Sequence, residues 1–496
     1  MQYRLLIFVG VVLGANLQVL DTTMATVALP RIQGTLSATL DEIAWVLASY
    51  LIAVAIVMPL VGTLTQRMGR KRVFLISVAG FCIASIFTGS ADSLQEIVIY
   101  RFLQGIFASS LVPISQSFVF DAYPPEERGR AMGWWSLGIM AGMVSGPAIG
   151  GYLAEFHNWR WAFYINVPIG LIAFGLIYVF GPSRPHRPAG QPFGLVGFLL
   201  LSVGLVCTQI VLSRGERMDW FSAPQIIWAT VVAVFAFYLF GVHSTYSSRP
   251  FIARRVLSDR NFMIGFVCLF LLGLQWLSFL TLISPYLQIL AGYPVFLAGL
   301  VMVPQALGNA AGSVLGGQLV SRAHPLKLMV CGVLALAWAN WQMSSLTPDF
   351  NRSVFYSIVF LHGFGIGIFF VPLSVVTFST LPRQYRDVGT GLFSLARNLG
   401  SSVGVSLVIA FLVRETQVNR YILKDYASPF NEVFRHTLVP QLWDTAEKTG
   451  ASLFELEVSR QAATIAYIDD FLSLAITSLI FLPILYFIRL PSRGEV

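Results

Sequence analysis

The chain has 496 residues, of which 56% are hydrophobic and only 11% are charged, and its formal net charge is +8. The mean hydropathy of +0.72 excludes a soluble domain of this length, because such domains carry about 25% charged residues. The positive charge does not indicate a nucleic-acid-binding protein, since it is spread over short loops between long apolar runs.

Fourteen apolar runs are long enough to cross a bilayer, which takes about 20 residues in a helix. We therefore predict an all-α polytopic membrane protein with transmembrane helices at residues 5–29, 43–62, 73–90, 97–120, 131–154, 161–181, 193–212, 225–242, 262–290, 296–320, 326–345, 353–377, 389–413 and 467–489. The first run is longer than the apolar core of a cleavable signal peptide, so we expect it to be retained.

Basic residues gather in every second loop. The loop after the second span holds Arg67, Arg70, Lys71 and Arg72, and the loops after the fourth, sixth, eighth, tenth and twelfth spans are also basic. The loops between them hold few basic residues. Because cytoplasmic loops carry an excess of lysine and arginine, this alternation predicts that both termini lie in the cytoplasm.

The chain contains a short internal repeat. The pattern Gly62-x-Leu64-x-x-Arg67 follows the second span, and Gly317-x-Leu319-x-x-Arg322 follows the tenth. Two similar halves of parallel topology are typical of transporters. We predict a six-helix N-terminal half, an inserted helix pair with its flanking loops, and a six-helix C-terminal half that includes an external loop at 414–463, with bounds at 1–181, 182–260 and 261–496.

Two spans carry glycines at intervals of four, a spacing that places them on one helix face. Small residues on a transmembrane helix allow a neighbouring helix to approach closely. We interpret the two stripes as opposite sides of a conformational seam between the halves, formed by Gly138, Gly142, Gly146, Pro147 and Gly150 and by Gly308, Gly312 and Gly316. The alternative is ordinary close packing inside one half.

Motifs for soluble chemistry are missing from the sequence. We find no nucleotide-binding loop, no cluster of His, Asp and Glu with metal-ligand spacing, and no nucleophile elbow. The four cysteines all fall within predicted spans, where apolar thiols are more common than disulfides. We therefore expect no enzyme, no cofactor, no metal site and no ATP-driven pump.

Several segments, in this order, resemble motifs of one family. They are LDTTMATVALPRI at 20–32, GTLTQRMGRKR from Gly62, RFLQGIFASSLVPIS from Arg101, and GPAIGG at 146–151. The chain resembles the major facilitator superfamily, in its fourteen-helix drug:proton antiporter branch of the EmrB type. The resemblance implies two six-helix halves plus two inserted helices.

The resemblance also implies a function and partners. It implies proton-coupled multidrug efflux of amphipathic compounds across the cell inner membrane by alternating access. In members of the EmrB type it implies a periplasmic membrane-fusion adaptor protein and, through it, an outer-membrane channel. The alternative is a proton-coupled exporter or importer of one specific metabolite. We expect the external loop at 414–463 either to dock the adaptor or to be a solvated connector.

The motif after the second span departs from the family pattern at one position. Gly62, Arg67, Gly69 and Arg70 fit the motif and would belong to the cytoplasmic gate, but Gln66 stands where the family usually has aspartate. In the family, that carboxylate helps to latch the halves together. Glutamine forms hydrogen bonds but no ion pair, so we expect a weaker latch or one carried by other groups.

Few ionisable residues fall inside the spans, and each is a functional candidate for that reason. Asp21 and Arg101 both lie in the outer halves of their spans, where they can meet. Burial favours the protonated carboxyl and a nearby arginine favours the charged one, so a carboxylate under both effects can load and release a proton. We interpret the pair as the proton-coupling site; the alternative is a structural ion pair.

Polar residues inside other spans predict a substrate cavity. Hydrophobic compounds bind to mostly apolar pockets that contain a few polar groups. The candidate residues are Gln18, Gln104, Gln275, Trp276, Gln305, Asn309, Arg397 and Asn398. Arg397 has three open interpretations: it balances an anionic group, it binds backbone carbonyls at an inner gate, or it extends to the cytoplasm.

Overall fold

The computed structural model describes residues 2–38, 40–182, 194–247, 250–293, 302–320, 322–345, 351–426 and 448–489. Every regular element in these ranges is a helix, which confirms the predicted all-α class. Thirteen helical segments within them are long and apolar enough to cross a membrane. The remaining predicted span, 296–320, corresponds to α15 (Met302–Leu319), while residues 296–301 lie outside the described ranges.

The N-terminal half is built around α1 (Gln2–Thr35), which packs against α7 (Pro125–Phe156), α9 (Asn166–Phe180) and α6 (Leu111–Ala122). The other elements of this half are α2 (Leu40–Val57), η1 (Met58–Leu60), α3 (Val61–Met68), α4 (Arg70–Ser90), α5 (Leu94–Ala108) and α8 (Trp161–Tyr164). Because α1 lies at the centre of this half, its residues face several neighbouring helices.

Prolines divide two of the predicted spans. The fourth span consists of α5 and α6, which meet at Ser109 and Ser110. Pro113 explains this break, because it has no N–H to donate to the carbonyl of Ser109. In the second span, Pro59 lies within η1 between α2 and α3. The breaks let one span contribute both to the core of its half and to the contact between halves.

The C-terminal half repeats this arrangement. Its spanning elements are α13 (Arg260–Pro285) with η4 (Tyr286–Leu290), α15, α16 (Pro325–Met343), α17 (Arg352–Ser379), α18 (Arg386–Tyr426), α20 (Lys448–Leu479) and α21 (Phe481–Leu485). The closest pairings are α15 with α17 and α13 with α18. The short elements α12 (Arg254–Leu257) and η5 (Arg383–Tyr385) lie at helix connections.

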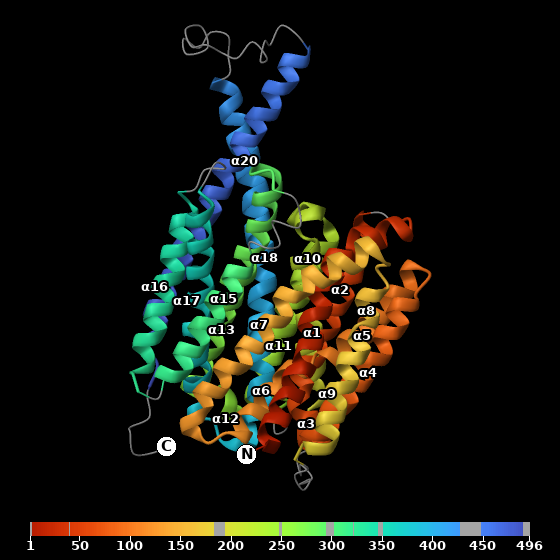
Figure 1. Cartoon of the computed structure of the whole chain (residues 1–496), viewed down its shortest axis with the longest axis vertical. Helices are drawn as coiled ribbons and strands as arrows, with labels where there is room; N and C mark the ends of the chain where they lie inside the picture. Colours follow the sequence, from red (N-terminus) through yellow and green to blue (C-terminus); the bar gives the residue numbers. More distant parts are fainter. Residues whose placement is uncertain are drawn as a thin grey trace.

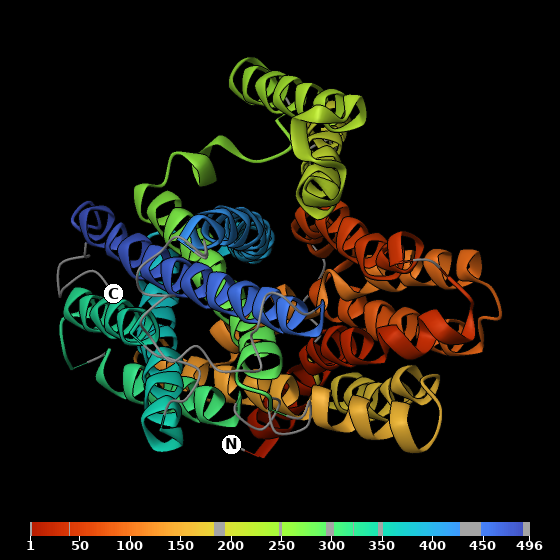
Figure 2. The same cartoon turned by 90° about the horizontal axis from the view of Figure 1, so that it is seen from above.

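The inserted pair lies outside both halves. It consists of α10 (Leu195–Arg214) and α11 (Pro224–Tyr246), joined through η2 (Glu216–Met218) and η3 (Trp220–Ser222). Figure 2 shows the pair, in yellow-green, apart from the two groups of helices. Contacts of α10 with α2 and α18 attach it to the rest. The large exposed side chains of α11, such as Trp228, Phe235 and Tyr238, suit a surface that faces lipid.

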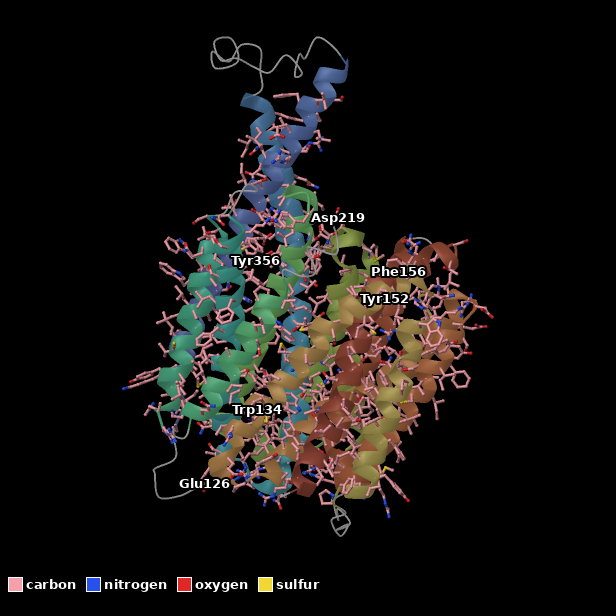
Figure 3. The ribbon with its side chains drawn as sticks, in the orientation of Figure 1. Glu126, Trp134, Tyr152, Phe156, Asp219 and Tyr356 are labelled. Atoms are coloured by element: carbon pink, nitrogen blue, oxygen red, sulfur yellow. The ribbon has the colours of Figure 1, made fainter. Side chains whose placement is uncertain are left out.

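The two ends of the molecule differ. Both termini lie at one end, and α18 and α20 extend beyond the other helices at the opposite end (Figure 1). Figure 3 places Glu126 at the end with the termini and Asp219 at the opposite end, in agreement with the predicted alternation of loops. The projecting parts of α18 and α20 pair through Glu455, which binds Arg420 and lies 3.3 Å from Lys424. Residues 427–447 of the predicted external loop lie outside the described ranges.

The predicted contact between the two glycine stripes is wrong. Gly138, Gly142, Gly146 and Gly150 lie against Val12, Asn16, Thr23 and Met24 of α1. Gly308, Gly312 and Gly316 lie against α17, at Phe360, Phe364 and Ile368. Each stripe therefore packs a helix pair inside its own half, which is the alternative that the sequence left open. The side chain of Pro147 lies outside the described residues.

The helices α7 and α15 nevertheless meet across the boundary between the halves, at other small residues. A Cβ added to Gly133 would lie 2.6 Å from the carbonyl oxygen of Ser313, and one added to Gly129 would lie 2.9 Å from that of Gly317. Farther along, the Ser313 hydroxyl donates to the Ser136 hydroxyl at 3.0 Å. The backbones of the two halves therefore touch near the end that carries the termini.

Candidate functional site

A charged cluster joins the halves at the end with the termini. The guanidinium of Arg70 binds Asp121 of α6 and Asp387 of α18, each at 2.6 Å. The Ser117 hydroxyl also donates to Asp387. Gly69, with φ of 85°, makes the turn from α3 to α4 in a conformation that glycine adopts at little cost. This turn places Arg70 at the boundary between the halves.

Gln66 takes a small part in this contact. Its side-chain amide donates to the backbone carbonyl of Gln384 in the other half at 3.2 Å, while Arg67 is exposed in the last turn of α3. Two ion pairs join the halves here, Arg70 with Asp387 at 2.6 Å and Arg386 with Asp121 at 3.7 Å. Asp121 and Asp387 were missed in the sequence because each lies at the edge of a span, where acidic residues are common.

The internal repeat has a structural counterpart. Gly62 of the N-terminal half lies against the backbone of Val388 in the C-terminal half, and Gly317 of the C-terminal half lies against Gly129 in the N-terminal half. The two copies therefore make equivalent close approaches across the boundary. This pair of contacts explains the shared glycine, since a side chain would separate the halves.

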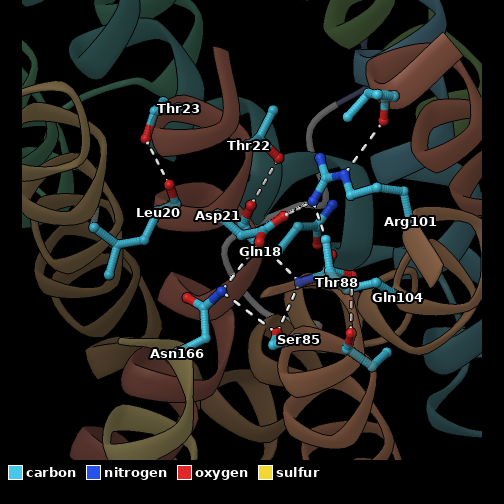
Figure 4. A network of polar contacts seen from close by, with 12 residues as sticks. Gln18, Leu20, Asp21, Thr22, Thr23, Ser85, Thr88, Arg101, Gln104 and Asn166 are labelled. Carbon is cyan, nitrogen blue, oxygen red and sulfur yellow. Dashed lines mark hydrogen bonds and ion pairs between the residues drawn. The ribbon is translucent and has the colours of Figure 1, made fainter. Parts of the chain in front are cut away.

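Asp21 and Arg101 form a buried ion pair in the N-terminal half (Figure 4). Both side chains have no exposed surface. The Asp21 carboxylate also accepts hydrogen bonds from Gln104 at 2.8 Å and from Asn166 at 3.0 Å. The Arg101 guanidinium lies 4.4 Å from the ring centre of Tyr50. Asn166 and Tyr50 were missed because uncharged polar side chains are frequent in transmembrane helices.

Arg101 and two amide donors surround the Asp21 carboxylate, with one ion pair and two hydrogen bonds. Movement of α5 relative to α1 would separate the carboxylate from its counter-ion. The arrangement suits either a proton-binding switch or a permanent structural pair. Gln104 belongs to this network rather than to a cavity.

A cavity of about 30 Å³ lies between the two halves in this conformation. Residues of α7 form one wall, and residues of α13, α15, α17 and α18 form the other. Its apolar lining includes Trp135, Met140, Leu272, Trp276, Ile366 and Phe370, and its polar lining is Ser136, Asn309 and Arg397. Pockets for drug-like compounds are lined in the same way, mostly by apolar side chains with a few polar groups.

Three of the predicted cavity residues line this cavity: Trp276, Asn309 and Arg397. The others do not. Gln275 donates to Leu474 and Thr477 of α20, Gln305 binds His362 at 3.1 Å, and Asn398 contacts Met58 of the other half. Gln18 is half-buried on α1 and Gln104 binds Asp21. Polarity alone did not reveal which helix faces point to the cavity.

Asp470 of α20 is a further buried acidic residue. Its side chain has no exposed surface, and within the described residues neither carboxylate oxygen has a hydrogen-bond partner. Two other acidic residues, Asp469 and Glu415, act on it electrostatically. A charged carboxylate in such a place is costly, so burial makes Asp470 a second candidate for a proton-carrying group.

Comparisons with known proteins agree with the fold. A family model described as Major Facilitator Superfamily matches residues 11–405. Multidrug export protein EmrB of Escherichia coli (strain K12) is 33% identical over 422 residues, which are 84% of this chain and 82% of that protein. Fatty acid resistance protein FarB of Neisseria gonorrhoeae is 30% identical over 481 residues, or 97% of this chain and 95% of that protein.

Two solved structures share the fold. The proton:xylose symporter XylE superposes with a TM-score of 0.60 at 15% identity, covering 94% of each chain. The human organic anion transporter MFSD10 superposes with a TM-score of 0.60 at 15% identity, covering 96% of this chain and 99% of that one. Because the family model spans most of the chain and multidrug export proteins align along more than four fifths of it, the chain belongs to the Major Facilitator Superfamily, alongside the EmrB exporters.

Proposed function

We propose that the protein is a proton-coupled antiporter that exports amphipathic compounds across the inner membrane, as part of a pump with a periplasmic adaptor and an outer-membrane channel. The observation that carries the proposal is the mostly apolar cavity between the halves, closed off by ion pairs at the end that carries the termini. The names of the relatives, a multidrug export protein and a fatty acid resistance protein, support the same function.

The basic loops and the ion pairs between the halves also support an orientation in the membrane and a mechanism of alternating access. The arginine-rich loops at the end with the termini favour the cytoplasm for that end. The cavity would then be closed to the cytoplasm in this conformation. Separation of Arg70 from Asp387 would open it on that side, which is the exchange of access that antiport requires. Proton binding at Asp21 would supply the coupling.

Drug accumulation in cells tests this function directly. Cells that express the gene in a pump-deleted strain should accumulate less of an amphipathic dye than cells without it. A protonophore should remove this difference, because the proton gradient is the proposed energy source. Higher accumulation in the expressing cells would indicate uptake and contradict the proposal, and a difference that survives the protonophore would contradict proton coupling.

The proposed docking surface for the adaptor is the projecting part of α18 and α20. Four large apolar side chains on this projection are exposed: Tyr421 and Ile422 of α18, and Leu453 and Leu456 of α20. Exposed apolar groups on a surface outside the bilayer favour contact with a protein. The projection is also the part of the described chain that extends farthest from the membrane-spanning bundle (Figure 1).

We expect a Tyr421→Ser/Leu456→Ser variant to lose co-purification with a periplasmic adaptor and to keep normal insertion and dye binding. Deletion of 425–455 should have the same effect. A matched surface variant, Glu455→Ala, removes only exposed ion pairs, which are worth about 0–1 kcal/mol, and should keep the adaptor. Unchanged co-purification of the double variant would remove the docking surface.

A further inference from the structure

Arg397 lies deep in the molecule. It follows the start of α18 at Arg386 by eleven residues, about 16 Å of helix. That is about half of the roughly 30 Å hydrocarbon core of a bilayer. A side chain that lines the cavity at this depth does not reach the cytoplasm. The structure therefore disfavours the interpretation in which Arg397 extends to the cytoplasm. Charged residues at such depth are rare and are usually functional.

Arg397 brings the only formal charge to the cavity wall. Among the described residues that line the cavity, every other side chain is apolar, aromatic or an uncharged polar group. Two acidic residues of the N-terminal half, Asp21 and Asp121, already bind arginines, Arg101 and Arg70 respectively. A ligand in this cavity therefore meets a positive potential.

The guanidinium of Arg397 has no protein partner in the described structure. No hydrogen bond or ion pair joins it to the described residues. Ser136 and Asn309, the other polar groups of the wall, lie 3.4 Å apart across the boundary, at hydrogen-bonding distance from each other. An arginine held among Trp135, Trp276 and Phe370 without a counter-ion is costly, and an anionic group of a ligand would offset that cost.

We propose that the cavity selects amphipathic organic anions, and that Arg397 binds their carboxylate or sulfonate group while the aromatic wall holds the apolar body. This inference rests on the proposed export function and names its substrate class. The planar guanidinium donates two parallel hydrogen bonds to such a group. Neutral compounds of the same shape bind through the apolar wall alone, without a contribution from Arg397.

The test compares two probes of nearly identical shape. Anilinonaphthalene sulfonate is an anion, and phenylnaphthylamine is the same ring system without the sulfonate. Both become fluorescent in apolar sites, so binding is measured on the purified protein in nanodiscs, with empty nanodiscs as the blank. Arg397→Gln should bind the sulfonate about 10- to 100-fold more weakly, the usual effect of losing a charged hydrogen-bond partner, and should bind phenylnaphthylamine unchanged.

A matched variant controls for net charge. Arg214→Gln removes the same charge from the end of α10, where Arg214 stands over the ring of Trp45 outside the cavity, and should bind both probes normally. Equal weakening of both probes by Arg397→Gln, or no weakening of either, would overturn the proposal. So would an equal loss of sulfonate binding in Arg214→Gln. Because no proton gradient is present, a failure of proton-coupled transport would not affect this result.

Discussion

Asp21→Asn is expected to abolish substrate-driven proton movement in proteoliposomes. The variant cannot carry a negative charge, so it cannot exchange a proton for a substrate. In the unmodified protein, Arg101, Gln104 and Asn166 donate hydrogen bonds to the Asp21 carboxylate. The variant places an uncharged amide among these three donors. Breaking one side of a buried ion pair costs about 3–5 kcal/mol, so the single variant will also be less stable.

A double variant separates the coupling role from the structural one. Asp21→Asn/Arg101→Met removes both charges and replaces the guanidinium by an apolar chain, an exchange that often restores stability. If Asp21 is the coupling group, the double variant folds and binds dye but moves no protons. Proton exchange at the normal rate in this folded variant would leave Asp21 with only a structural role.

The matched control for this experiment is Asp219→Asn. Asp219 is exposed at a turn between α10 and α11 and has φ of 54°. Asparagine adopts this left-handed conformation readily, so the variant loses a carboxylate without backbone strain. Its proton exchange should equal that of the unmodified protein.

The sequence predicted the meeting of Asp21 and Arg101 because charges inside apolar spans are few and costly. The spans were predictable as well, since about 20 consecutive apolar residues are the length that a helix needs to cross a bilayer. The partners of Asp21 were not predictable in this way. Asn166, which donates to Asp21, and Ser85, which accepts from Gln104 and Asn166, are uncharged. Their residue types occur throughout the spans, so only packing shows that they belong to this network.

The spacing of the glycine stripes did not identify the helices that they contact. Spacing by four predicts a face for close approach, and Gly142 and Gly312 both lie against a neighbouring helix. The spacing contains no information about which helix that is. The inter-half contact instead uses Gly129 and Gly133 on another part of α7, and Gly317 on α15. Gly129 and Gly133 belong to no long repeat, so the sequence did not distinguish them, and Gly317 stood out only through the short internal repeat.

Gly133→Val is expected to reduce transport strongly while leaving each half folded. Valine at this position would press against the backbone of Ser313 and Val314 in the other half. Overpacking of this kind costs about 1–3 kcal/mol, and the cost falls on the closed contact between α7 and α15 rather than on packing within a half. The population of the closed state, relative to the open one, should therefore fall by a factor of roughly 5 to 150.

Valine variants of two other glycines, Gly175 and Gly142, serve as comparisons for Gly133→Val. Gly175→Val on α9 adds the same side chain where no atom lies within 4 Å, so transport and thermal unfolding should stay normal. Gly142→Val on α7 would press against Asn16 inside the N-terminal half, so it should lower the unfolding temperature before it changes the balance of states. Transport loss in Gly133→Val with an unchanged unfolding temperature therefore identifies the α7–α15 contact as the moving boundary. Normal transport in that variant would show that the halves do not need this contact to close.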